Sequence, residues 1–96
     1  MTDEEMTVLV TEFREDFQIP PYYPEYVLKR ALQLCAARLT GLKRDADFVR
    51  DLVGRGLLKN YAYYEFYHNA DEFMKNYGPD VRTWQLNAEV PDAEEG

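Results

Sequence analysis

The chain has no serine at all, and only one cysteine and one histidine among its 96 residues. The lack of serine excludes a serine nucleophile. Cys35 can form no disulfide within the chain and no CxxC metal site, and its helical spacing predicts a buried free thiol. His68 has no second histidine and no cysteine near it to complete a zinc site, so we expect a packed or capping residue.

Long apolar runs and a basic N-terminus are also lacking. No apolar run approaches the roughly 18 residues that a membrane span needs. The chain opens with an acidic run at residues 3–5, where a signal peptide would be basic, so we expect the protein to stay in the cytoplasm. A glycine-rich phosphate loop would need a preceding strand, and no convincing strand is present. These absences predict a protein without a cofactor, and we do not expect an enzyme.

Negative charge dominates the composition, with a formal net charge of −7. It is spread unevenly, because residues 1–25 carry −6, residues 26–60 carry +5 and residues 61–96 carry −6. One interpretation is a set of solvated helix faces. The other is complementary surfaces that meet in an assembly, acidic ends against basic middles. Nucleic-acid binding is disfavoured, because phosphate repels such a chain.

Apolar residues recur at helical spacing in four segments. The first helix begins at a capping-box pair, Thr2 and Glu5, and ends before Ile19. The prolines of "QIPPYYP", residues 18–24, then break the chain. The second helix closes at Gly41 and turns one apolar face to the core. That face comprises Leu28, Ala31, Leu32, Cys35 and Leu39.

The third predicted helix is capped by Asp45 and runs to about His68. Two glycines inside it, Gly54 and Gly56, indicate either tight packing of a neighbouring helix or a short break, because each costs about 1 kcal/mol against alanine. We favour a continuous or slightly kinked helix.

Asn69 begins the fourth predicted helix, with Glu72 at the capping-box spacing. Pro79 either ends or kinks this helix, because a proline removes a backbone donor. The sequence therefore predicts an all-α fold, a small bundle of four to five helices in one domain over residues 1–86. Residues 87–96 are predicted to be a flexible acidic tail.

The stretch "LLKNYAYYEFYHNADEFMKNY", residues 57–77, contains seven aromatic residues. Its apolar side chains fall on three sides of a helix, which is typical of a helix surrounded by others. A chain this short has few helices to surround it, so we expect at least one side to face another molecule or to be half covered. No lysine or arginine interrupts residues 61–67, whereas a platform for single-stranded nucleic acid needs positive charge. The rings therefore indicate core packing or a protein interface.

The runs "LLKNYAYYEF", "DEFMKNY" and "VRTWQL" resemble the C-terminal half of small head–tail connector proteins of long-tailed bacteriophages, also called adaptor or head-completion proteins. The N-terminal half is similar in outline, with a helix, "FQIPPYY" as a linker and an amphipathic helix. Pro79 departs from the pattern, because the family usually continues as helix there. The matching positions are Leu57, Leu58, Lys59, Asn60, Tyr61, Tyr64, Phe73, Asn76, Tyr77, Val81, Trp84, Gln85 and Leu86.

The resemblance implies an all-helical structural protein of the virion, located at the head–tail interface and made in the host cytoplasm. Such proteins assemble as a ring, a dodecamer, beneath the portal protein. The ring extends the DNA channel, lets DNA pass without specific binding, and docks the next stopper or tail-completion protein. Two alternatives stay open: a small regulatory or antitoxin-like protein that binds one partner, and an enzyme subunit with a composite site.

Two sets of residues are predicted to matter in this role. The first packs the core or the subunits against each other, and comprises Leu57, Leu58, Tyr61, Tyr64, Phe73, Tyr77, Trp84 and Leu86. The second is a possible interface with a neighbouring subunit or the portal, and comprises Arg50, Arg55, Lys59, Tyr63 and Tyr67. We expect the basic segment 29–59 to pair with acidic segments of the neighbour.

Overall fold

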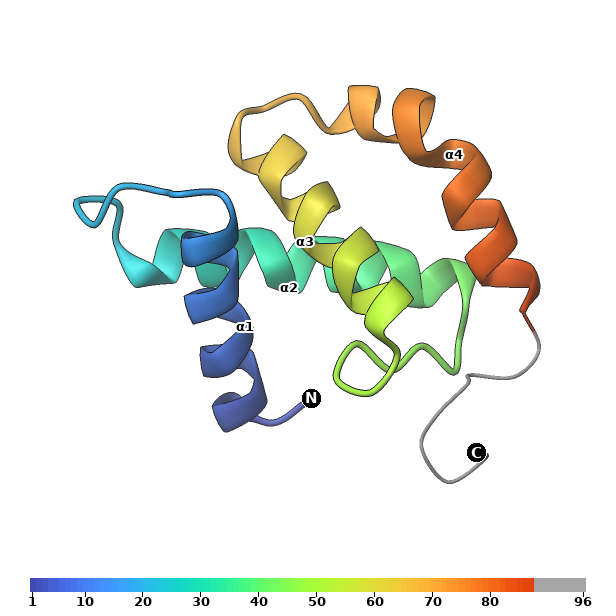
Figure 1. Ribbon diagram of the computed structural model, residues 1–96, viewed down its shortest axis with the longest axis horizontal. Coiled ribbons are helices and arrows are strands. Elements are labelled where there is room, and N and C mark those ends of the chain that lie inside the picture. The colour runs from blue at the N-terminus through green and yellow to red at the C-terminus, as the bar shows by residue number, and fades with distance from the viewer. Residues whose placement is uncertain (88–96) are drawn as a thin grey trace.

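In the computed structural model, which describes residues 1–87, four helices form a small bundle, and none of those residues is in a strand. The helices are α1 (Asp3–Asp16), α2 (Glu25–Leu42), α3 (Leu52–Phe66) and α4 (Ala70–Leu86). Helix α2 packs against α1 and α3, and α4 packs against α3. Figure 1 shows α2 running behind α3, with α1 and α4 on opposite sides of it. The predicted all-α fold is confirmed, and the predicted tail beyond Asn87 lies outside the described residues.

Helix α1 begins at the predicted capping box. The Thr2 hydroxyl accepts from the Glu5 amide at 3.1 Å, and the Glu5 carboxylate accepts from the Thr2 amide at 2.8 Å. After α1, the proline-rich connection is held by Arg14, whose guanidinium donates to the carbonyls of Pro20 and Tyr23 at 2.7 and 2.8 Å. The connection is therefore fixed against the end of α1.

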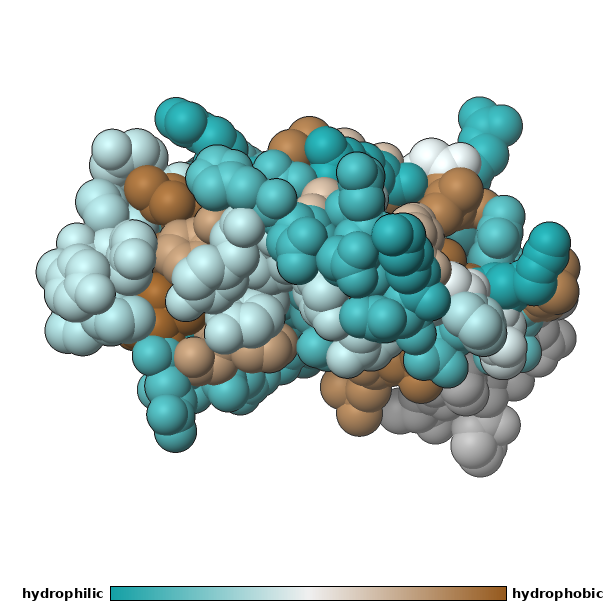
Figure 2. Space-filling view, turned by 90° about the horizontal axis from the view of Figure 1, so that it is seen from above, coloured by the Kyte–Doolittle hydropathy of each residue, from teal (hydrophilic) through white to brown (hydrophobic). Residues whose placement is uncertain are grey.

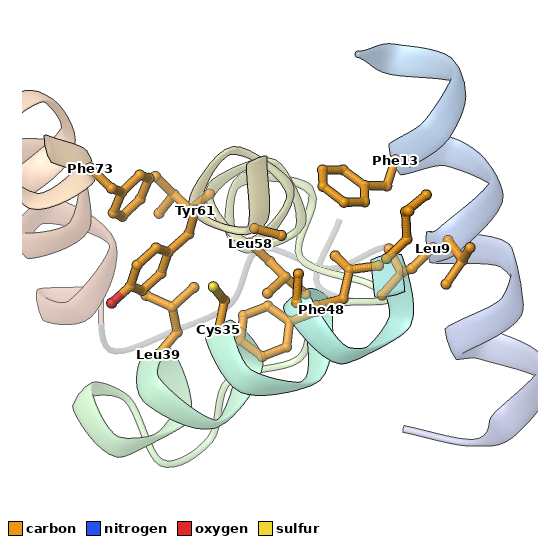
Figure 3. Close-up of a cluster of buried hydrophobic side chains, with 14 of the residues drawn as sticks. Leu9, Phe13, Cys35, Leu39, Phe48, Leu58, Tyr61 and Phe73 are labelled. Carbon is orange, nitrogen blue, oxygen red and sulfur yellow. The ribbon is translucent and has the colours of Figure 1, made fainter. Parts of the chain in front are cut away.

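The core is a single layer of apolar side chains between α2 and its neighbours. All five predicted core residues of α2 are buried. Figure 3 shows Phe13 and Leu9 of α1 entering this layer from one side of α3 and Phe73 of α4 from the other. Cys35 lies in the middle as the predicted buried thiol, and burial, followed by the charge of Glu65, raises the pKa of that thiol to about 12.

Helix α3 begins later than the sequence predicts. Asp51, not Asp45, is its N-cap, and the Asp51 carboxylate accepts from the Val53 amide at 3.1 Å. The Asp47 carboxylate instead accepts from the amides of Val49 and Arg50, at 3.0 and 3.1 Å. An aspartate that bonds to amides two or three residues ahead favours a turn over continued helix. Residues 45–51 are therefore a connection, and α3 starts at Leu52.

Gly54 marks the closest contact between α3 and α4. A Cβ atom on Gly54 would lie 2.9 Å from the Trp84 indole nitrogen and 3.0 Å from the Asp51 carboxylate, whereas one on Gly56 would meet nothing within 4 Å. The indole donates to that carboxylate at 2.7 Å. On its other side, the buried Lys43 ammonium lies 5.9 Å from the Trp84 ring and donates to the Asn87 carbonyl at 2.7 Å. Of the two predicted explanations for the glycines, tight packing applies to Gly54.

Helix α4 runs without a break through Pro79, so of the two predicted alternatives, that this proline ends the helix or kinks it, the first is excluded. Pro79 is exposed, so the carbonyl left without a donor can bond to water, and Gly78 has no Cβ to clash with the proline ring. The predicted capping box at Asn69 is also wrong. Its side chain makes no cap bond, and the Glu72 amide donates to the Asn69 carbonyl at 3.0 Å instead.

Most of the predicted packing residues are inside the bundle. Tyr64 and Tyr77 are half-buried, and five others are buried, namely Leu57, Leu58, Tyr61, Phe73 and Trp84. Leu86 is 72% exposed and does not join the core of this chain, so only the second part of its prediction, packing between subunits, stays open. A residue two positions after Trp84 points about 200° away around a helix, so it cannot face α3 as well.

Candidate protein-binding groove

The aromatic residues of α3 separate into a buried group and an exposed group. Tyr61 is 6% exposed and stacks on Phe73, with ring centroids 4.3 Å apart and planes within 6°. Tyr67, at the end of the helix, is 54% exposed. Tyr63 and Tyr64 lie between these extremes. The prediction that α3 has more apolar surface than one short chain can cover is confirmed on the side that carries Tyr63 and Tyr67.

A groove of about 440 Å³ lies over this exposed side of α3. Phe17 at the end of α1 lines one part, and Asn69 and Tyr77 of the α4 region line another. The remaining lining residues come from α3, namely Asn60, Tyr63, Tyr64 and Tyr67. Seven residues from three helices and their ends therefore form one concave surface, and five of them are aromatic.

Hydrogen bonds between α3 and α4 hold part of this lining in place. The Asn76 amide donates to the Tyr64 hydroxyl at 3.0 Å, and the Tyr77 hydroxyl donates to the Asn60 carbonyl oxygen at 3.3 Å. The Asn60 amide in turn donates to the Gly56 carbonyl at 2.9 Å. Positioned rings lose little side-chain freedom on binding, which favours a docking surface.

The groove continues into a wider aromatic surface near the proline-rich connection. Phe17 stacks on Tyr63 at 4.3 Å, and Tyr63 meets Tyr67 edge to face at 5.0 Å. Further rings follow at centroid distances of 4.8–5.0 Å, through Phe66, Tyr23 and Tyr22. Figure 2 looks onto this side, and its left part, over the 17–24 connection, is pale rather than strongly hydrophilic. Sequence reasoning treated "FQIPPYY" as a linker and missed its contribution.

The Tyr67 hydroxyl on this surface is held in its protonated form. The pKa of Tyr67 is raised above its ordinary value, first by desolvation and then by the neighbouring Tyr63 hydroxyl, with smaller effects from Tyr23 and Tyr22. Tyrosines of this kind offer apolar rings and neutral hydrogen-bonding tips, which are enriched at protein interfaces.

Most of the basic side chains that were predicted to contact a neighbouring subunit form ion pairs with acidic residues of the same chain. Arg55 donates to Glu12 at 3.0 Å, and Lys59 donates to Glu12 at 3.2 Å and to Asp16 at 2.6 Å. Arg38 likewise pairs with Glu65 at 2.9 Å. The acidic first helix is thus the partner of the basic third helix in the same molecule. Arg55 and Lys59 are therefore already paired within the chain, and their pairing with a neighbouring subunit stays a prediction.

Arg50 lies away from the groove. Its side chain is 66% exposed and comes within 4.0 Å of Asp47. It borders a second, larger hollow of about 890 Å³ between the start of α1, α2 and the 45–50 connection, where Phe48 and Ala36 lie. The structure therefore brings Tyr63 and Tyr67 together and places Arg55 and Lys59 against α1. Arg50 lies outside the groove lining and next to Val49, whose carbonyl accepts from the Arg55 guanidinium at 3.2 Å.

Among the residues close in sequence to the groove lining, the exposed and unpaired charged groups are carboxylates. Glu15, Asp71 and Asp80 are exposed, lie within three residues of a lining residue, and take part in no ion pair among residues 1–87. The bases equally near in sequence, Arg14, Lys59 and Lys75, all donate to acceptors of the same chain. The groove lining is thus mostly aromatic, and the exposed, unpaired charges nearest to it in sequence are acidic.

The part of the chain that the structure describes holds no group of three or more residues arranged to bind a metal ion. Within the same range, no helix is both long enough and apolar enough to cross a membrane. Comparisons of the chain with models of protein families, with curated proteins and with solved structures find no match.

Proposed function

We propose that the protein is a structural head–tail connector, a subunit of a ring beneath the portal of a tailed bacteriophage. The resemblance that suggests this role covers residues 57–86, which form most of α3, all of α4 and the connection between them. Its Leu58, Tyr61 and Phe73 are core residues that join α3 to α2 and α4. The pattern therefore describes how a helical hairpin packs, which supports a shared fold with that family.

The observation that carries the proposal is the aromatic groove over α3. A partly exposed set of five rings, two of which are held by hydrogen bonds between α3 and α4, is suited to docking another protein. A connector must contact proteins on several sides. Leu52 and Val53, 72% and 60% exposed at the opposite end of α3 from Tyr67, offer a second apolar contact.

The ion pairs within the chain leave fewer free charges for contacts between ring subunits than the sequence suggests. Because Arg55 and Lys59 are paired internally, ring contacts must draw their affinity mainly from apolar and aromatic side chains. Exposed ion pairs contribute only about 0–1 kcal/mol each in any case. The net charge of −7 suits a channel wall that repels DNA phosphate and lets it slide. A dodecamer on the portal would add many weak contacts into a stable ring.

Co-sedimentation with the portal ring of the phage that encodes the chain tests this proposal. We expect the wild-type chain to move with the portal through a density gradient. The Tyr67→Ala variant should remain largely at the top, and the Tyr26→Ala variant should move with the portal. Tyr26 is a matched control because it is 61% exposed but lies outside the groove. If wild type never moves with the portal and instead binds a single other protein, the regulatory alternative replaces the connector.

A further inference from the structure

We propose that the aromatic groove binds a cationic side chain, an arginine or lysine on a basic segment of the docking partner. This inference rests on the proposed function and deepens it, because it names the chemistry of the segment that the groove takes. It is carried by the arrangement of rings, by the charges around them, and by the way other rings of the same chain are used.

The lining combines faces of aromatic rings with neutral polar groups. Phe17 and Tyr63 lie nearly parallel, and Tyr67 stands edge-on to Tyr63 at an interplanar angle of 77°. Tyr64 and Tyr77 close another side, also edge to face, at 77°. The face of an aromatic ring carries partial negative charge, so it attracts a cation placed within about 6 Å of its centre.

Other rings of this chain already hold cations of the chain itself. Arg30 lies over Tyr26 and Arg38 over Tyr61, each 5.7 Å from the ring centroid. The buried Lys43 ammonium lies 5.9 Å from the Trp84 ring. No lysine or arginine of residues 1–87 lies over any of the five groove rings in this way. The groove therefore has the chemistry of these sites without a cation from the described chain.

The chain has the complementary charge for a basic partner, with a net charge of −7 and exposed carboxylates close in sequence to the groove lining. Glu15, Asp71 and Asp80 are exposed and unpaired within the described chain, while the nearby bases are already bonded. Carboxylates around a surface of this kind speed the approach of a cation and raise its affinity. An acidic or phosphorylated partner would be repelled by the same residues. A purely apolar partner would gain nothing from them.

A binding measurement with a defined probe tests the inference. The probe is a short peptide that contains two arginines, and its matched control contains citrulline, which keeps the shape and loses the charge. Both are titrated into the isolated chain while the aromatic proton signals of the tyrosines are followed by NMR. We expect the arginine peptide to shift Tyr63, Tyr64 and Tyr67, and to bind about five- to tenfold more tightly than the citrulline peptide.

Two variants at Tyr67 show whether the aromatic ring itself is needed for binding of the arginine peptide. Tyr67→Ala should weaken arginine-peptide binding about fivefold, whereas Tyr67→Phe should keep it within about twofold because the ring remains. Tyr26→Ala should change neither affinity nor the groove signals. Because Tyr67 is 54% exposed, these variants should fold normally, which a thermal melt checks.

Four results would overturn the inference. They are equal affinity for the citrulline peptide, shifts confined to tyrosines outside the groove, no shift up to millimolar peptide, and binding only to an uncharged proline-rich peptide. Peptide binding is measured on the isolated chain and portal co-sedimentation on the mixture, so the two proposals fail separately. If the chain moves with the portal but binds the arginine and citrulline peptides equally well, the connector role stands and the cation-binding inference is wrong.

Discussion

Replacing Gly54 by alanine tests the contact between α3 and α4. The new Cβ would lie 2.9 Å from the Trp84 indole nitrogen, 3.0 Å from the Asp51 carboxylate and 3.3 Å from the indole carbon Cε2. Trp84 is 2% exposed and its ring is stiff, so it cannot turn away without disturbing the core. The 2.7 Å bond from the indole to Asp51 would lengthen or break.

Opposing effects determine how much Gly54→Ala changes the free energy of unfolding. Alanine in place of glycine favours the helix by about 1 kcal/mol. Overpacking a filled site costs about 1–3 kcal/mol, and weakening a buried bond to a carboxylate costs about 1–3 kcal/mol more. The net expectation is a loss of about 2 kcal/mol in the free energy of unfolding. Gly56→Ala is the matched control, because its Cβ meets nothing within 4 Å, and it should gain about 0.5–1 kcal/mol.

Urea denaturation and thermal unfolding, both followed by Trp84 fluorescence, measure the two variants, since Trp84 is the only tryptophan in the chain. The two melting temperatures should differ by roughly 10–20 °C, with Gly54→Ala the lower. If Gly54→Ala is as stable as Gly56→Ala, the packing of Trp84 over α3 is not as described.

Three further predictions concern other parts of the bundle. Lys59→Met should cost about 1 kcal/mol in 50 mM salt and less in 1 M salt, because it removes ion pairs with Glu12 and Asp16. Burial lowers the pKa of Lys59, but the hydrogen bonds to Asp16 and Glu12 outweigh burial and leave it raised. Urea titrations at a series of pH values should therefore show this stabilisation in full below the pKa of Lys59 in the unfolded chain. The stabilisation should be lost as pH rises through the pKa of Lys59 in the folded chain. Cys35 should react with a thiol reagent at pH 8 only as fast as the chain unfolds, because it is fully buried and its pKa is about 12; immediate reaction would contradict its placement. Pro79→Ala should raise the free energy of unfolding by about 1–3 kcal/mol, since α4 is continuous there, and a destabilised variant would mean that the proline is required.

Much of the fold follows from local chemistry that a sequence displays. The Thr2–Glu5 capping box, the apolar face of α2 and the prolines after α1 depend on residues close in sequence, and all three were predictable. The start of α3 was not. Asp45, Asp47 and Asp51 are all acceptable caps by type, and the choice falls on Asp51 because its second oxygen bonds to Trp84, 33 residues away.

The candidate groove was predictable only in part. The excess of rings on α3 indicated an interface, and Tyr63 and Tyr67 do line it. Phe17 joins them because α1 ends beside α3, an arrangement set by the tertiary fold. The net charges of the segments likewise gave no sign that Arg55 and Lys59 pair with α1 of the same chain. Sums of charge along a sequence cannot distinguish pairing within a molecule from pairing between molecules.

Restoration of infectivity to heads made without this chain tests the connector role most directly. Filled heads assembled in its absence should fail to join tails, and adding the purified wild-type protein or Tyr26→Ala should restore infectious particles. Tyr67→Ala should restore far fewer, because the docking groove has lost an exposed ring. If heads made without the chain join tails as well as wild-type heads do, the protein is not a head–tail connector.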